Sequence, residues 1–274
     1  MTAPRAALVF LAAGAVLLIG GPLRWIASQR GWKTGERLPV LFHRVVCAAL
    51  GVRVRVHGQA ASARPQLIVS NHISWIDICV LGSMRPAEFL AKKEVGASGL
   101  ARAALSLQGV VLVDRARRRA IPAVNAEIAR RMRTGAAVIL FAEATTGDAN
   151  RLLPFRSSHF EAVRQTLDAG GAAQATVQPL FIAYSRCAGL PLGRSQRPLV
   201  AWYGDMTFFS HFNRLLRAGR IDCDVYCGAP IPFFADSNRK DVARRAEEAV
   251  RAMARQARQS PRRDPAIFVR LETS

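Results

Sequence analysis

The sequence predicts an α/β protein with a mixed sheet flanked by helices and preceded by an N-terminal membrane helix. Short apolar runs of strand length alternate with stretches of helical periodicity over residues 52–235. The uncharged run 6–23 would be about 27 Å long as a helix, against a hydrocarbon core of about 30 Å. The 274 residues carry a formal net charge of +20 and are 50% hydrophobic. Such hydrophobicity excludes a disordered chain.

Residues 1–50 are expected to form a membrane anchor followed by an amphipathic helix. Arg5 alone precedes the apolar run, whereas four cations follow it between residues 24 and 37. This bias places the rest of the chain on the cytoplasmic side of the inner membrane. Glycines and a proline within the run leave a tilted or partly inserted anchor open, and a cleaved signal peptide is the competing interpretation. The apolar stripe of 38–50 fits either the membrane surface or the core.

Residues 51–235 are expected to form the main α/β domain. Its strands are predicted at 52–58, 66–71, 109–114, 136–143, 176–184, 199–204 and 221–228. Helices are predicted at 75–84, 117–133, 157–169, 208–218 and 238–257. The last helix belongs to a third region, 236–274, a basic helix and tail. We expect that helix to be a solvated surface element, with membrane contact as the alternative.

Charge and motifs narrow the class of partner. A basic, hydrophobic protein suits an anionic partner, and the hydropathy favours an anionic membrane over nucleic acid. Five cysteines without a Cys-x-x-Cys pair argue against a disulfide framework and for a reducing compartment. The sequence has no Gly-x-Ser-x-Gly elbow, P-loop or Gly-x-Gly-x-x-Gly, which argues against a serine hydrolase, an NTPase and a dinucleotide enzyme.

The stretch SNHISWIDICVL, beginning at Ser70, is the most informative for chemistry. His72 and Asp77 are five residues apart, so on one continuous helix their side chains would diverge. They can meet if His72 lies in a loop and Asp77 in the first turn of the next helix, with Ser74 available as the N-cap. A histidine oriented by a carboxylate can take a proton from a hydroxyl through its other ring nitrogen. A structural hydrogen-bonded pair is the alternative.

The order of four sequence blocks resembles the glycerol-phosphate and lysophospholipid acyltransferase family. The first is Asn71-His72 followed by Asp77, the family's Asn-His-x4-Asp motif. GVVLVDR (109–115) resembles the second block, FAEATT (141–146) the third and VQPL (177–180) the fourth. The resemblance covers most of residues 40–235. It implies the family's α/β fold and an acyl transfer from a thioester to a lysolipid hydroxyl.

The resemblance also assigns roles to individual residues. His72 would be the general base and Asp77 the residue that orients it. Glu143 would contact the acceptor, with Arg115 as its charged partner in binding the head group. The other substrate-binding candidates are Asn71, Lys92, Thr145 and Pro179. The implied partners are an acyl carrier protein or coenzyme A thioester, a lysolipid and the membrane, without nucleic acid, metal or organic cofactor.

Two departures from the family pattern bear on the acceptor. Ala144 stands where the family usually has glycine, which implies a tolerated turn conformation or a reshaped pocket. Thr146 stands where phosphatidate-forming members usually have arginine, a bidentate donor suited to phosphate. The wider stretches 141–163 and 183–206 resemble instead the branch that acylates lyso-ornithine lipid, whose head group lacks phosphate. Lysophosphatidate is the alternative acceptor, because Arg115 and Lys92 or Lys93 are still present to hold a phosphate. A non-catalytic basic protein that binds nucleic acid or anionic lipid is the alternative outside enzymology.

Overall fold

The computed structural model describes residues 2–30, 37–92, 105, 110–113, 118–259 and 267–268. Its helices are α1 (Thr2–Gln29), α2 (Arg37–Leu50), α3 (Ile76–Gly82), α5 (Ile121–Arg133), α6 (Glu161–Asp168), α7 (Phe208–Ala218) and α8 (Arg239–Gln259). Short 3-10 turns are η3 (Arg118–Ala120), η4 (Ser157–Phe160) and η5 (Arg197–Leu199). Its strands are β1 (Val52–His57), β2 (Gln66–Ser70), β3 (Glu88–Lys92), β4 (Val110–Val113), β5 (Ala137–Phe141), β6 (Gln174–Cys187), β7 (Leu190–Pro191), β8 (Ile221–Cys227), β9 (Ile231–Phe234) and β10 (Ile267–Phe268).

The strands of the described chain form one mixed sheet in the order β10-β1-β8-β6-β2-β5-β3-β4, with β7 and β9 also paired to β6. The five adjacent strands β6, β2, β5, β3 and β4 run parallel to one another, whereas β8, on the other side of β6, runs antiparallel to it. β2 and β5 are buried at every position, as expected of parallel strands covered on both faces. The predicted mixed sheet is therefore confirmed.

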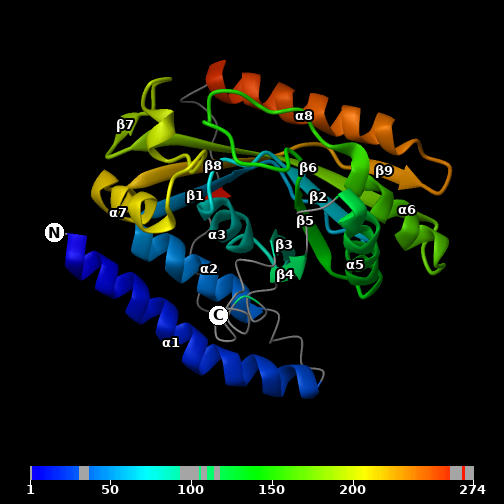
Figure 1. The fold of residues 1–274 in the computed structure, drawn as a ribbon, viewed down its shortest axis with the longest axis horizontal. Helices are drawn as coiled ribbons and strands as arrows, with labels where there is room; N and C mark the ends of the chain where they lie inside the picture. Colours follow the sequence, from blue (N-terminus) through cyan, green and yellow to red (C-terminus); the bar gives the residue numbers. More distant parts are fainter. Residues whose placement is uncertain are drawn as a thin grey trace.

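Helices cover both faces of the sheet (Figure 1). One apolar core contains α3 and α7 together with α2, and includes Ile76, Val80 and Leu215. The opposite core contains α5, α6 and α8, with Ile128, Val163 and other fully buried side chains. This arrangement of helix, sheet and helix leaves the ends of the strands open for a site.

The N-terminal segment is a helical pair lying beside this sandwich. α1 packs along α2, and α2 in turn packs on α3 and β1. α2 buries Val40, Val46 and Leu50, so core packing is the observed arrangement of the amphipathic stretch 38–50. Within the described residues, no helix combines the length and the apolar character needed to span a bilayer. The predicted spanning helix over 6–23 thus has no support from the structure.

One predicted strand is wrong, and some observed strands were missed. Residues 199–204 form part of η5 and a loop instead of a strand, because the apolar Val200 and Ala201 are buried in the core without sheet pairing. Strands β3 and β9 were not predicted. β9 contains Pro232. In the described chain β9 pairs with β6 alone, so it is an edge strand, and edge strands tolerate proline.

The basic helix α8 contributes to the same core as the sheet. Its Val242, Ala246 and Val250 are buried, and the helix packs on β6, β9 and η4, while its charged residues face outward. The expected solvated helix is therefore solvated on one face only. Its last turn reaches the ends of the strands, where Gln256 and Arg258 border a cavity.

Candidate active site

The cavity lies at the carboxyl ends of β2 and β5. β2 ends opposite Leu180 of β6, but β6 continues to Cys187 and pairs there with β8. The extension of β6 therefore forms a wall beyond the end of its neighbour. A site at the carboxyl edge, beside a strand whose two neighbours differ in direction, is a common binding position in open α/β sheets.

His72 lies in the loop between β2 and α3, and hydrogen bonds to its backbone fix that loop. The backbone amide of His72 donates to Glu143 at 2.8 Å, and its carbonyl accepts from the amide of Gly147 at 2.9 Å. The next carbonyl, of Ile73, accepts from the amide of Trp202 at 2.9 Å. These bonds come from loops far along the chain, so they hold the histidine in place from several directions.

Asp77 lies in the first turn of α3 and is completely buried. Its Oδ2 accepts hydrogen bonds from His72 Nδ1 at 2.9 Å and from the backbone amides of Ile73 and Ser74 at 2.6 and 2.9 Å. The predicted contact between His72 and Asp77 is therefore present. The predicted N-cap is not, because Trp75 takes that position without a side-chain bond and the Ser74 hydroxyl has no partner in the described chain. The carboxylate of Asp77 itself satisfies the amides before the helix.

Tyr184 of β6 completes the environment of Asp77. Its hydroxyl donates to Asp77 Oδ1 at 2.7 Å. Burial, and then the charge of Asp77, raise the pKa of Tyr184 well above its usual value, so the phenol keeps its proton and remains a donor. No local pattern predicts this contact, because the two residues are 107 positions apart in the chain.

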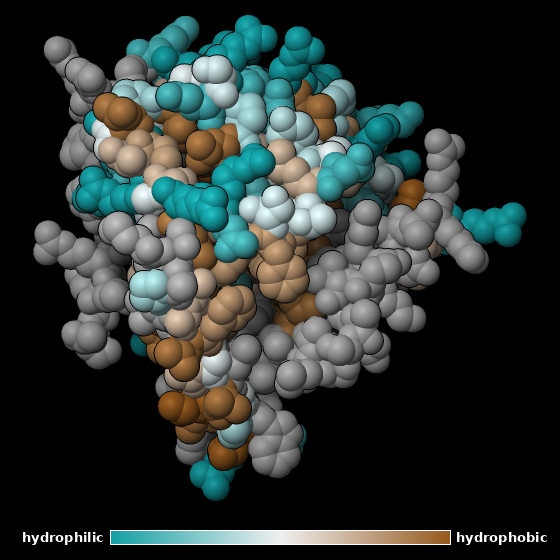
Figure 2. Space-filling view, turned by 60° about the vertical axis from the view of Figure 1, so that its left-hand side comes forward, coloured by the Kyte–Doolittle hydropathy of each residue, from teal (hydrophilic) through white to brown (hydrophobic). Residues whose placement is uncertain are grey.

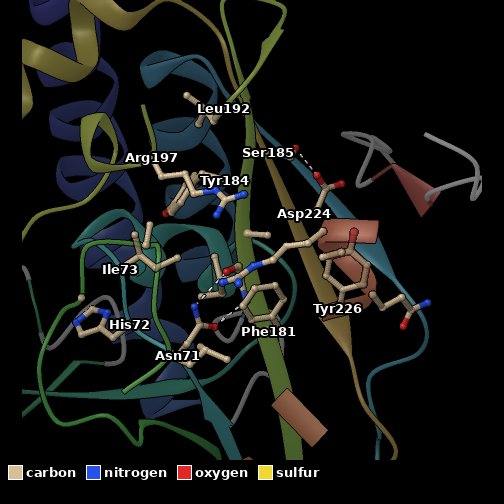
Figure 3. Close-up of a pocket in the computed structure, with 18 of the residues that line it drawn as sticks. Asn71, His72, Ile73, Phe181, Tyr184, Ser185, Leu192, Arg197, Asp224 and Tyr226 are labelled. Atoms are coloured by element: carbon tan, nitrogen blue, oxygen red, sulfur yellow. Dashed lines mark hydrogen bonds between the residues drawn. The ribbon is translucent and has the colours of Figure 1, made fainter. Parts of the chain in front are cut away.

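The geometry fixes which nitrogen of His72 can do chemistry. Asp77 accepts a hydrogen bond from Nδ1 of His72, so Nδ1 carries the proton. Nε2 is therefore left as the basic atom of the ring. The imidazole ring stacks on Phe141 at 3.9 Å between ring centroids and 10° between planes. The ring borders the cavity (Figure 3) and is 18% exposed, enough to meet a substrate. The pair can thus act as an oriented general base.

Glu143 braces the same loop from the other side. Its Oε2 accepts from the amide of His72 and its Oε1 from the amide of Leu153 at 2.7 Å. Burial raises the pKa of Glu143 to about 7, although the two amide bonds act in the opposite direction. Glu143 borders the cavity as the acceptor-contact prediction requires, but both of its oxygens already bind backbone amides.

The remaining predicted substrate residues lie in different places. Asn71 borders the cavity, but its side chain binds the backbone of Ile182, accepting at 2.8 Å and donating at 3.1 Å. Thr145 is exposed and Pro179 is buried within β6, and neither lines the cavity. Lys92 ends β3, but its side chain and all of Arg115 lie outside the described residues, as does Lys93.

This chain is similar to known proteins over most of its length. A family profile described as Acyltransferase matches residues 53–183. A lyso-ornithine lipid O-acyltransferase of Brucella abortus is 42% identical over 85% of this chain and 86% of its own length. One of Rhizobium meliloti is 37% identical over 87% and 82%. The chain belongs to the acyltransferase family.

More distant relatives include a 1-acyl-sn-glycerol-3-phosphate acyltransferase of Neisseria meningitidis, 32% identical over 49% of this chain and 52% of its own. The crystal structure of the 1-acyl-sn-glycerophosphate acyltransferase PlsC from Thermotoga maritima has the same fold. It superimposes with a TM-score of 0.63 at 18% identity, covering 97% of this chain and 100% of that one.

Ala144 shows how this acyltransferase departs from its family. Its φ is +62°, in the left-handed region that favours glycine. Of the two alternatives left by the sequence, the structure contains a tolerated turn, closed by the Ala144 amide on the carbonyl of Phe141 at 3.1 Å. An alanine in this conformation stores roughly 1 kcal/mol.

The acyltransferase cavity has a volume of about 640 Å³ and continues from His72 along β6. Asp224 of β8 borders its far part, together with Arg55, His57 and Tyr226. Arginines border it on other sides: Arg151, Arg186, Arg197 and Arg258. None of these residues was singled out from the sequence, because they come from separate strands, loops and the end of α8.

Proposed function

We propose that this acyltransferase moves a fatty acyl group from a thioester to the hydroxyl of lyso-ornithine lipid. The observation that carries the proposal is His72, held at Nδ1 by the buried Asp77 with Nε2 left for the cavity. The relatives that match most of the chain support the choice of acceptor, because they bear the name lyso-ornithine lipid O-acyltransferase.

In the proposed mechanism, Nε2 of His72 takes the proton of the acceptor hydroxyl as its oxygen attacks the thioester carbonyl carbon. The new C–O bond gives a tetrahedral intermediate. As that intermediate collapses, the C–S bond breaks and the imidazolium returns the proton to the thiolate. Asp77 stabilises the imidazolium through Nδ1 and keeps the ring in the productive tautomer.

Purified protein with a labelled acyl thioester and lyso-ornithine lipid tests the reaction directly. Loss of a general base typically lowers turnover ~10²–10⁴-fold, so His72→Ala should be nearly inactive while remaining folded. His159→Ala is the matched control, since His159 binds Asn125 and does not line the cavity. Wild-type turnover by folded His72→Ala would contradict the mechanism.

Lysophosphatidate is the alternative acceptor, supported by the relatives named 1-acyl-sn-glycerol-3-phosphate acyltransferase. Because Thr146 stands where phosphatidate-forming members of the family usually have arginine, we expect lyso-ornithine lipid to react much faster at equal concentration. Thr146→Arg should shift the preference toward lysophosphatidate by roughly ten- to a hundredfold through charge-assisted bonds to phosphate. Equal or faster wild-type turnover of lysophosphatidate would overturn the assignment of the acceptor.

The proposed donor is the thioester of acyl carrier protein or of coenzyme A. Both carry anionic phosphates, which suit a chain with a formal charge of +20. Parallel assays with the two thioesters of one acyl chain would identify the donor through the larger kcat/KM.

We also place the enzyme on the cytoplasmic face of the inner membrane. Exposed apolar side chains of α1 support this location, among them Leu11, Leu18 and Ile19. In Figure 2 apolar residues gather over the lower part of the view, where α1 lies. α7 contacts α1 and adds the exposed Phe208 and Phe209. Such side chains bind the interfacial layer of a bilayer.

Fractionation of cells tests the location. The protein should leave the membrane with detergent and not with salt, because salt screens only the electrostatic part of the attachment. Deletion of residues 1–36 should weaken membrane association more than folding. Release by high salt alone would point to an electrostatic attachment and contradict the apolar one.

A further inference from the structure

The far part of the cavity is bordered by charged and polar residues that the transfer reaction does not use. We call Arg55, His57, Ser185 and Asp224, together with Asp222, which does not line the cavity, the carboxylate cluster. Asp224 accepts from His57 Nε2 at 2.8 Å and lies 2.9 Å from Arg55 Nε. Ser185 also donates a hydrogen bond to Asp224, and Arg55 reaches Asp222 at 3.3 Å. Asp222 and Asp224 are 5% and 6% exposed.

Within this cluster two buried carboxylates face one permanent cation. Asp222 and Asp224 share the partly buried guanidinium of Arg55, and Asp224 also pairs with the imidazole of His57. The next cation, Arg220, is 3.8 Å from Asp222 and its side chain is 61% exposed, so its charge is largely screened by water. Oδ1 of Asp222 is buried without a hydrogen bond in the described chain. Asp224 borders the cavity, so a cation that enters the cavity can pair with this carboxylate in addition to Arg55.

The opposite charge lies on other walls of the same cavity. We call Arg151, Arg186, Arg197 and Arg258 the arginine wall. In the described part of the chain, none of the four has a carboxylate within ion-pair distance. Arg186 and Arg197 are half-buried, and Figure 3 shows Arg197 directed into the cavity from the side of Ile73 and Leu192. Burial and the like charges of Arg258 and Arg194 lower the pKa of Arg197.

The spacing suits a ligand that carries both charges. β2 and β8 are separated by β6, and neighbouring strands lie about 5 Å apart, so the carboxylate cluster is roughly 10 Å from the end of β2. In Figure 3 His72 and Asp224 lie on opposite sides of β6, with Arg197 between them. When the acceptor hydroxyl lies at His72, a head group of amino-acid size on the same lipid can therefore reach Asp224.

We propose that the arginine wall and Asp224 form a subsite for a zwitterionic head group, with the acceptor's carboxylate at Arg197 and its ammonium at Asp224. The inference rests on the proposed function and extends it to the residues that select the acceptor. An N-acylated ornithine keeps one carboxylate and one side-chain ammonium, which matches both charges. A phosphate head group matches the arginines alone and is repelled by Asp224, so the subsite works against lysophosphatidate.

Acceptor analogues test the ammonium contact without any variant. The side-chain amine of lyso-ornithine lipid is acetylated in one analogue, which removes its charge, and ethylated in another, which keeps the charge at similar size. Wild-type kcat/KM should fall roughly ten- to a hundredfold for the acetylated lipid and change little for the ethylated one. Equal rates on all three lipids would overturn the head-group assignment.

Asp224→Asn identifies the residue responsible. The kcat/KM of the variant on lyso-ornithine lipid should fall by roughly ten- to a hundredfold. Its kcat/KM on the acetylated analogue should not fall further than that of wild type. The variant then no longer distinguishes the two lipids. A residue with a merely structural role would lower both rates equally and preserve the discrimination, which would overturn the assignment of Asp224. Asp168→Asn, an exposed aspartate outside the cavity, is the matched control and should behave as wild type.

Arg197→Gln with the methyl ester of lyso-ornithine lipid tests the carboxylate contact in the same way. The ester should be a poor acceptor for wild type, and Arg197→Gln should no longer distinguish it from the free acid. Persistent discrimination would remove Arg197 from the subsite. Failure of wild type to acylate lyso-ornithine lipid at all would instead overturn the proposed function, so the two failures are distinguishable.

Discussion

Two buried carboxylates hold His72, and they do so in different ways. Asp77 binds the imidazole and is surrounded by donors: the ring, two backbone amides and the hydroxyl of Tyr184. Glu143 binds the backbone amide of His72 and one further amide, that of Leu153. The residues are 0% and 5% exposed, so burial alone does not distinguish them.

The number of donors explains what each carboxylate can do. A buried carboxylate remains charged when hydrogen bonds replace its lost hydration. Glu143 accepts too few hydrogen bonds for this, so burial dominates and raises its pKa to about 7. The nearby charge of Asp77 acts in the same direction. Asp77, with four donors, is suited to stabilise an imidazolium, whereas Glu143 is suited to position a loop.

Replacement of Asp77 by asparagine should have the largest effect. In a Ser-His-Asp triad the equivalent change costs ~10⁴-fold in kcat, because the amide favours the wrong imidazole tautomer. We expect a loss of that order in Asp77→Asn, with KM for the acceptor nearly unchanged. Initial-rate kinetics on the folded variant check this. A loss confined to KM would show that Asp77 acts in binding instead of in orienting the base.

The second largest effect should be the pH dependence that Glu143 gives to the stability of the protein. The pKa of Glu143 is about 7 in the folded protein and its ordinary value is 4.5, so between these values the folded state holds more protons. Its contribution to stability is therefore complete below about pH 4.5 and is lost as the pH rises to about 7. The loss is roughly 3 kcal/mol.

Denaturant unfolding of wild type and Glu143→Gln at several pH values in one detergent measures this contribution. The free energy of unfolding of wild type, relative to the variant, should decrease from pH 4.5 to 7 and then level off. A difference that increases over that range would show that Glu143 is stabilised as a charged group.

The kcat of the Glu143→Gln variant should fall less than that of the Asp77→Asn variant. The amide of glutamine can accept from one of the two backbone amides but presents its own N–H to the other, so the loop around His72 loosens. We expect about a tenfold fall in kcat, the order of one hydrogen bond of the stronger kind. A fall as large as that of Asp77→Asn would mean that Glu143 takes part in the chemistry.

The smallest expected effect concerns the residue next to Glu143. Ala144→Gly relieves the left-handed conformation at φ +62° but increases the freedom of the unfolded chain. The two terms nearly cancel, and we expect a change in unfolding free energy of at most about 1 kcal/mol with unchanged kcat. A large change in kcat would show that the turn at Ala144 shapes the site as well as supporting Glu143.

The sequence by itself determined the elements with strong local patterns. The apolar runs at β2 and β5 and the periodic stretch 208–218 were predicted because buried strands and amphipathic helices repeat at their own periods. It also determined the contact of His72 with Asp77, because a spacing of five residues across a loop and a first helical turn is a local property.

Only the tertiary structure decided what surrounds that pair. Tyr184 reaches Asp77 from 107 positions away, and Glu143 reaches the His72 amide from 71. Asp224 and Arg197 border the same cavity, and this likewise depends on the order of β2, β6 and β8 in the sheet. Such contacts leave no periodic trace in the sequence, because each residue alone fits an ordinary strand or loop. The order of strands brings them together, and the long-range packing of the core fixes that order.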